Sequence, residues 1–141
     1  MKKYELLEHT ADVRVRVHGK TLELLFKHAA IALFDLLVNY KPKRKKTREI
    51  SLEAETLEEL FVNWLNELIS IFYAYKFLPS DYNIIIVDAE HRKTMHASVK
   101  GEFFNPYDNK KINQEIKAAT YHNLKIEKDK KGYRAEIIFD V

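Results

Sequence analysis

The sequence predicts an α+β fold, a single domain over residues 1–141 in which two long helices pack on a mostly antiparallel or mixed sheet of about seven strands. The length of 141 residues suits one domain. Two segments in the first part of the chain repeat apolar residues at three- and four-residue steps, as amphipathic helices do. Strand-like segments follow one another later, which favours an α+β fold over a doubly wound sheet.

The N-terminal elements begin with two predicted strands at residues 3–7 and 13–18, joined by a bend or bulge at residues 8–12. In the second strand, valines alternate with arginines and a histidine, which is the pattern of a half-buried strand. A helix should begin at Thr21, because leucine, phenylalanine and alanine residues then form one apolar stripe. Pro42 and the basic segment around it should end this helix.

The middle of the chain predicts another strand and the second helix. Residues 48–55 alternate between apolar and polar side chains. Thr56, with Glu59 three residues later, forms a capping box that should start the helix. Trp64 lies on the apolar face of this helix and is expected in the core. The Pro79–Asp81 segment is predicted as a break.

The residue pattern of the C-terminal part of the chain predicts strands only. Residues 82–88 and 93–103 form two of them, and residues 112–129 have an extended, β-rich pattern with one break. A turn at residues 130–132 should lead into the last strand, residues 133–139. Together with the earlier strands, these segments give the expected total of about seven.

Several classes of protein chemistry are excluded by residues that the sequence lacks. The chain has no cysteine, so it cannot form disulfides, thiolate metal sites or a cysteine nucleophile. It has neither a Gly-x-Gly-x-x-Gly motif nor a phosphate-binding Gly-Lys-Ser/Thr loop. No uncharged apolar segment approaches the length of a membrane span, and no signal peptide is evident. The lack of cysteine also fits a reducing compartment, and we expect no membrane span.

Positive charge is concentrated in one short segment. Six of the 24 lysines and arginines fall there, and the remaining 18 face 21 acidic residues, so the rest of the chain is mildly acidic. The segment is either a solvated connection between a helix and a strand or a surface that contacts RNA phosphates or a protein partner. Its basic residues are Lys41, Lys43, Arg44, Lys45, Lys46 and Arg48.

Two aspartates and the C-terminus form the candidate metal site. Asp12 immediately precedes the second strand, Asp140 follows the last strand, and Val141 carries the terminal carboxylate. If these two strands lie side by side, three hard oxygen donors converge, and such donors suit Ca²⁺ or Mg²⁺ better than zinc. His9 and His122 are candidates for orienting these ligands.

Each aspartate also has a simpler interpretation. Asp12 could bond a turn amide, as aspartate often does before a strand, and Asp140 could be a solvated terminal residue. Two carboxylates could instead act as general acid and base. The sequence offers no nucleophile constellation or oxyanion hole to accompany them, so a metal-dependent hydrolase is under-equipped.

Four segments in register resemble the archease family, and the resemblance covers nearly the whole chain. They are Glu8-His9-Thr10-Ala11-Asp12-Val13, Trp64-Leu65-Asn66-Glu67-Leu68, Lys117-Ala118-Ala119-Thr120-Tyr121-His122 and Ile137-Ile138-Phe139-Asp140-Val141.

The resemblance implies a small cytoplasmic accessory protein, not an enzyme. Archeases assist the RtcB-type tRNA ligase in tRNA splicing and RNA repair by promoting its guanylylation and multiple turnover. The family's metal-binding aspartates and C-terminus match Asp12, Asp140 and Val141. Ca²⁺ is the ion expected first, with Mg²⁺ or Mn²⁺ as alternatives. A chaperone-like modulator of RNA-modifying enzymes is a competing interpretation, and a free-standing metal-dependent hydrolase is a weaker one.

The chain departs from the family pattern in two places. The segment after Gly101-Glu102 lacks the arginine and histidine that usually follow an acidic turn, and only Asp108 keeps the acidic position. Asn123 replaces the glycine that usually follows Tyr-His. Because asparagine tolerates a left-handed turn, we expect the second change to be mild.

Overall fold

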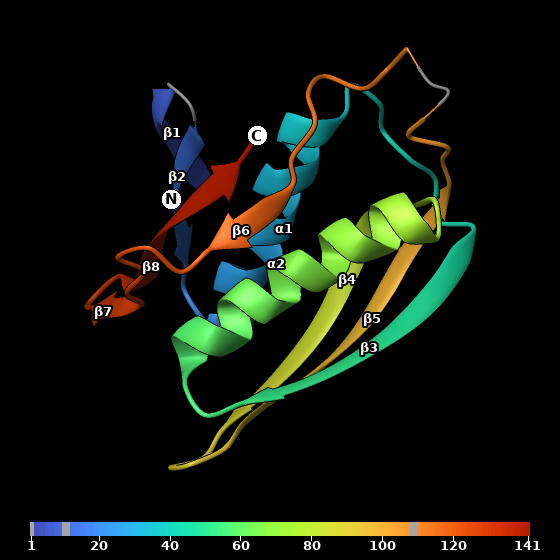
Figure 1. Cartoon of the computed structure of the whole chain (residues 1–141). Coiled ribbons are helices and arrows are strands. Elements are labelled where there is room, and N and C mark those ends of the chain that lie inside the picture. Colours follow the sequence, from blue (N-terminus) through green and yellow to red (C-terminus); the bar gives the residue numbers. More distant parts are fainter. Residues whose placement is uncertain (1, 10–11, 108–109) are drawn as a thin grey trace.

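The computed structural model describes residues 2–9, 12–107 and 110–141. Its strands form two antiparallel sheets (Figure 1). In the five-stranded sheet the order is β1-β2-β8-β6, and β7 also pairs with β8. These strands are β1 (Tyr4–His9), β2 (Asp12–Gly19), β6 (Ala118–Thr120), β7 (Glu127–Asp129) and β8 (Gly132–Asp140).

The second sheet has three strands in the order β3-β5-β4. They are β3 (Lys46–Ala54), β4 (Phe77–Asp88) and β5 (Lys93–Phe103). The predicted α+β class and antiparallel pairing are therefore confirmed. The described residues form eight strands, close to the expected number, but they divide between two sheets where one was expected.

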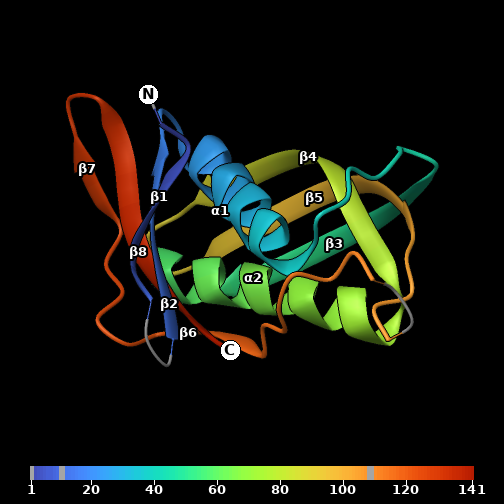
Figure 2. The ribbon, with the colours of Figure 1, turned by 90° about the horizontal axis from the view of Figure 1, so that it is seen from above.

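The two helices lie between the sheets (Figure 2). Helix α1 (Leu22–Leu37) contacts β2 and β8 on one side and β4 on the other. Helix α2 (Leu57–Ala74) contacts β6 and all three strands of the second sheet. None of the described helices is long and apolar enough to cross a membrane.

Both helices start where the sequence predicted. The hydroxyl oxygens of Thr21 and Thr56 each accept a hydrogen bond, at 3.1 Å, from the backbone N–H three residues later. Trp64 is fully buried in the core, as expected, and its indole N–H donates to the Phe26 carbonyl at 3.0 Å. This bond satisfies the indole's polar group and ties α2 to α1.

The predicted break at Pro79–Asp81 is wrong, because β4 continues through it. The register shifts between Pro79 and Asp81, so Ser80 forms a bulge inside one long strand. Proline is tolerated here because β4 is an edge strand, where its missing N–H costs no ladder bond. The Ser80 hydroxyl donates to the Pro42 carbonyl at 3.1 Å and holds the basic segment against the bulge.

The strands β1 and β2 also differ slightly from the expected bounds. β1 begins one residue later and ends two residues later than predicted, β2 is one residue longer at each end, and the register shifts between Leu6 and His9. A bulge in this region was expected. Residues 10–11 of the connection lie outside the described part of the chain.

Candidate metal site at the end of the β2–β8 strand pair

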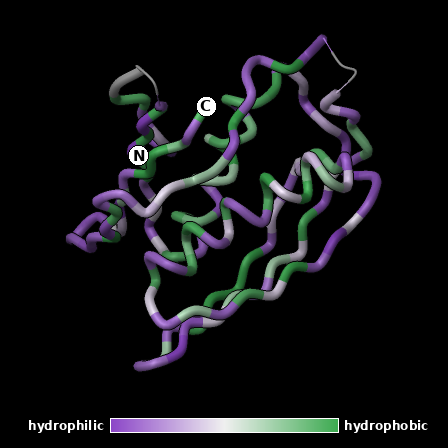
Figure 3. The backbone as a smooth tube through the Cα atoms, viewed as in Figure 1, coloured by the Kyte–Doolittle hydropathy of each residue, from purple (hydrophilic) through white to green (hydrophobic). Residues whose placement is uncertain are grey.

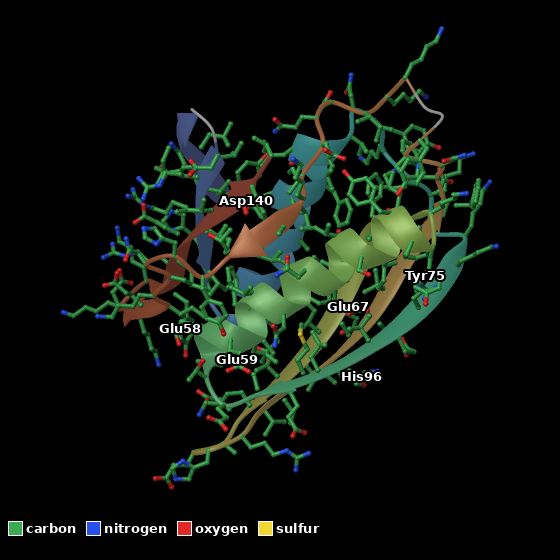
Figure 4. The ribbon with its side chains drawn as sticks, viewed as in Figure 1. Glu58, Glu59, Glu67, Tyr75, His96 and Asp140 are labelled. Carbon is green, nitrogen blue, oxygen red and sulfur yellow. The ribbon has the colours of Figure 1, made fainter. Side chains whose placement is uncertain are left out.

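Asp12 and Asp140 lie directly opposite each other in the antiparallel register of β2 and β8. Opposite residues point to the same face of a sheet, with their Cβ atoms about 4.5–5.5 Å apart. This is the outer face, because the adjacent Val13 and Phe139 are fully buried on the inner one. The two strands do lie side by side, which is the condition on which the candidate site depended, and Asp140 is seen at the end of β8 (Figure 4).

The end of β8 is held in place on both sides. Asp140 pairs with Asp12 on β2 and with Ala118 on β6. The Lys117 N–H also donates to the Asp140 carbonyl at 2.8 Å. Chain termini are usually poorly ordered unless they are tied down. Here the side chain of Val141 packs against the core, and this contact anchors the residue that carries the terminal carboxylate.

Asn66 on α2 positions this end of the sheet, and its role was missed from the sequence. Its side-chain oxygen accepts from the Ala119 N–H at 2.7 Å, and its amide donates to the Ala119 carbonyl at 3.1 Å. The side chain therefore satisfies both backbone groups on the outer edge of β6. The sequence did indicate this role, because Asn66 lies between the buried Leu65 and Leu68, and a polar side chain in such a place needs a hydrogen-bond partner.

The electrostatics of this sheet end favour a bound cation. Like charges directly opposite each other in a sheet are destabilising, and Asp12, Asp140 and the Val141 carboxylate add three formal negative charges. Arg14 lies two residues along β2 on the same face. An oxygen-only donor set suits Ca²⁺, Mg²⁺ or Mn²⁺ rather than zinc.

The donor set is small. Within the described residues, no three histidine or acidic side chains gather as a metal-binding group. The candidate site consists of two aspartates and the chain terminus, and water would complete the coordination shell of a hard cation. Metal binding by these groups stays a prediction.

Of the two histidines proposed to orient the aspartates, the structure describes the side chain of His122 alone. The backbone of His9 pairs with Val13 near Asp12, while its side chain and Asp108 lie outside the described parts. His122 is exposed and follows β6, which ends at Thr120 opposite Ile138. The chain there leads away from Asp140, so His122 is poorly placed to orient it.

The turn after β6 confirms one expectation about a departure from the family pattern. Asn123 has a φ of 55°, which is the left-handed conformation. Asparagine adopts this conformation more readily than most residues, so it can replace glycine here.

The basic segment lies on the far side of the molecule from β1 and β2 (Figures 1 and 2). Lys46 and Arg48 belong to β3, which starts earlier than predicted. The Arg48 guanidinium lies 4.5 Å from the centroid of the Tyr75 ring, a cation–π contact. Arg44 pairs with Asp81 at 3.7 Å. Arg44 and Arg48 are thus engaged within the protein.

Comparisons with known proteins identify the family. The model of the Archease protein family (MTH1598/TM1083) matches residues 4–141. Protein archease of Pyrococcus abyssi is 38% identical over 143 residues, covering all of both chains. Protein archease of Thermococcus kodakarensis is 40% identical over 129 residues, covering 91% of this chain and 90% of its own.

A solved structure supports the same assignment. The solution structure of Methanobacterium thermoautotrophicum protein 1598 superposes with a TM-score of 0.85, at 25% identity and with full coverage of both chains. Both the sequence and the arrangement of strands and helices are therefore shared with known members. This chain belongs to the archease protein family.

Proposed function

We propose that this protein is an accessory factor that activates an RtcB-type RNA ligase in tRNA splicing or RNA repair. It would promote guanylylation of the ligase and restore multiple turnover, without being an enzyme itself. Family membership supports this proposal, because the resemblance to archeases implies such a role. The observation that carries the role of the cation is the register that sets Asp12 opposite Asp140, next to the chain terminus.

The protein's own residues would hold the cation and present it to the ligase. Asp12 and Asp140 lie at the exposed end of the sheet, on strands that are fixed by their pairing. The Val141 carboxylate completes the donor set. A divalent cation bound there would offset negative charge that develops on a nucleotide triphosphate.

A free-standing hydrolase fits the structure less well. Such an enzyme would need a substrate recess beside the aspartates. A recess of about 920 Å³ is lined instead by residues at the opposite end of the β2–β8 pair, including His18 and Arg134.

The test is a single-turnover guanylylation assay with purified RtcB-type ligase, GTP and Mn²⁺. We expect the wild-type protein to speed formation of the ligase–guanylate intermediate, and Asp12→Asn to lose most of this effect, because a neutral amide is a poorer cation ligand. Asp88→Asn is the matched control, since Asp88 is also an aspartate at a strand end, in the other sheet. This control should activate like the wild type.

Two results would count against the proposal. Equal rates with the wild-type protein, with Asp12→Asn and with no added protein would exclude an accessory role. Full activation by Asp12→Asn would remove the cation from the mechanism and favour a chaperone-like modulator that acts through surface contacts.

A further inference from the structure

A basic recess lies at the opposite end of the β2–β8 pair from the aspartates. It has a volume of about 920 Å³ and is formed by the start of β1, the end of β2 and the β7–β8 hairpin. The hairpin is strongly hydrophilic (Figure 3). Six basic residues line the recess: Lys2, Lys20, Lys128, Lys130, Lys131 and Arg134.

A glycine brings the basic residues of the hairpin close to Lys20. Gly132 has a φ of +130°, and a Cβ atom there would lie 2.6 Å from the Gly19 carbonyl oxygen and 2.8 Å from the Lys20 Cα. Only glycine allows so close an approach of two backbones. The Asp129 carboxylate accepts from the Lys131 N–H at 2.7 Å, which fixes the turn. Cations from distant parts of the sequence thus converge.

The recess carries an excess of positive charge. Two acidic residues, Glu5 and Asp129, accompany the six bases, so its formal net charge of +4 exceeds the +3 of the whole chain. Glu5 already has basic partners, with Arg16 at 3.7 Å and Lys2 at 3.5 Å. The Asp129 carboxylate already accepts the hydrogen bond from the Lys131 N–H in the turn.

Three ammonium groups of the recess are available to a ligand. Within the part of the chain that the structure describes, the side chains of Lys20, Lys130 and Lys131 have no hydrogen-bond or ion-pair partner. All three residues are exposed. Gathering like charges is unfavourable without an anion, so this arrangement favours a ligand with several negative charges.

We propose that this recess binds the phosphate backbone of single-stranded nucleic acid. Several lysines in one concave surface suit a row of phosphates. His18 and Tyr133 also line the recess, and the Lys128 ammonium lies 5.4 Å from the centroid of the Tyr133 ring. Cations beside ring surfaces are typical of grooves for single strands. A volume of about 920 Å³ accepts a few nucleotides.

The lining argues against a protein or a membrane as the ligand. None of the described residues that line the recess is Val, Leu, Ile or Phe. The cores of protein interfaces are apolar and depleted in lysine. Binding to a lipid surface calls for apolar side chains that insert among the lipids. Phosphate recognition needs neither feature.

The inference does not rest on the proposed function. The recess lies about 20 Å along the strands from Asp12, given six residues at about 3.3 Å each. Nucleic-acid binding can therefore be measured with the purified chain alone, without ligase or metal. Asp12→Asn should leave it unchanged, so failure of either proposal can be recognised separately.

The experiment measures fluorescence anisotropy of a labelled 20-nucleotide uridine RNA in about 0.1 M salt, where distant charges are screened. The variant Lys20→Gln/Lys130→Gln/Lys131→Gln should bind at least about tenfold more weakly. For this variant, the slope of log affinity against log salt concentration should be shallower by about 2. Each phosphate contact on a single strand contributes about 0.7 to that slope, and three contacts are lost. The control replaces three exposed lysines elsewhere, Lys100→Gln/Lys110→Gln/Lys117→Gln, and should bind within about twofold of wild type.

Competitors identify the source of the phosphates. Unlabelled RNA should displace the probe, whereas GTP, inorganic tripolyphosphate and a polyglutamate peptide should need far higher concentrations. The inference is overturned if the wild-type protein does not bind the RNA, or if the control variant loses as much affinity as the recess variant. Displacement by GTP, tripolyphosphate or polyglutamate as readily as by RNA would also overturn it, in favour of a free polyphosphate or an acidic protein.

Discussion

At one end of the β2–β8 pair Asp12 lies opposite Asp140, whereas at the other end His18 lies opposite Arg134. The first end adds the terminal carboxylate to two aspartates. The second adds the lysines of the basic recess. Both ends lie on the same outer face, and the strands between them carry charges of both signs. One pair of strands therefore presents two surfaces of opposite charge.

The middle of the β2–β8 pair differs from its two ends in charge. Arg16 lies 3.7 Å from Glu5 and 3.6 Å from Glu136, so opposite charges are matched across three strands. Exposed pairs of this kind contribute little to stability, about 0–1 kcal/mol each. They do leave the middle nearly neutral. An excess of one sign of charge is found at the two ends, where a ligand of opposite sign can be bound.

Among single changes, the largest effect in this comparison should come from extending the C-terminus. Residues added after Val141 convert its carboxylate to a neutral peptide carbonyl and place new chain over the aspartates. We expect Ca²⁺ affinity to fall at least about tenfold, because even the loss of a group that only supports a ligand costs that much. The same tag at the N-terminus is the control. Equal Ca²⁺ binding by the two tagged proteins in calorimetry would remove Val141 from the site.

An intermediate effect is expected from Gly132→Ala, which should disturb only the basic end. The new Cβ would clash with the Gly19 carbonyl oxygen, and a φ of +130° is strained for alanine. Strain of this kind costs about 1–3 kcal/mol. Thermal unfolding should show a lower midpoint, and RNA affinity should fall several-fold as the hairpin moves. Ca²⁺ affinity should not change; a parallel loss of Ca²⁺ binding would show that the two ends are coupled.

The smallest effect concerns His28, which supports the basic end from α1. Its Nδ1–H donates to the His18 carbonyl at 2.6 Å, and burial lowers the pKa of His28 below the usual 6.5. The folded state thus binds this proton less readily than the unfolded state. The stabilisation is present above about pH 6.5 and declines as the pH falls below it.

His28→Gln should therefore reduce the acid sensitivity of the fold slightly. Between pH 7.5 and pH 5, we expect the melting temperature of the wild type to fall by about 1–2 °C more than that of the variant. His91→Gln is the control, because His91 is exposed and forms its ion pair with the neighbouring Glu90. A difference of the same size with this control would argue against His28 as the source.

Features set by local sequence could be predicted well. Helix starts depend on a capping side chain and the residues that follow it, so Thr21 and Thr56 marked both helices. The alternation of valines in β2 marked its buried face. Asp12 and Asp140 were recognisable as a possible pair because each borders a strand, although only the register shows that they are opposite.

Features that depend on distant contacts could not be predicted. The division into two sheets is set by pairing between segments far apart in the sequence, as between β2 and β8. The polar residues around Pro79 predict a turn, yet the structure has a bulge there, which is possible because β4 is an edge strand. The basic recess exists because Gly132 packs against Gly19, and no local pattern indicates that contact.

The most direct test of two separate sites is Ca²⁺ titration calorimetry on three proteins at about 0.15 M salt. The wild type should bind Ca²⁺, and Asp12→Asn/Asp140→Asn should lose at least about 100-fold in affinity, more than the loss of a supporting group costs. Lys20→Gln/Lys130→Gln/Lys131→Gln should bind within about threefold of wild type, because the two ends are separated by more than the screening length. Unchanged Ca²⁺ binding in the double aspartate variant would contradict the account.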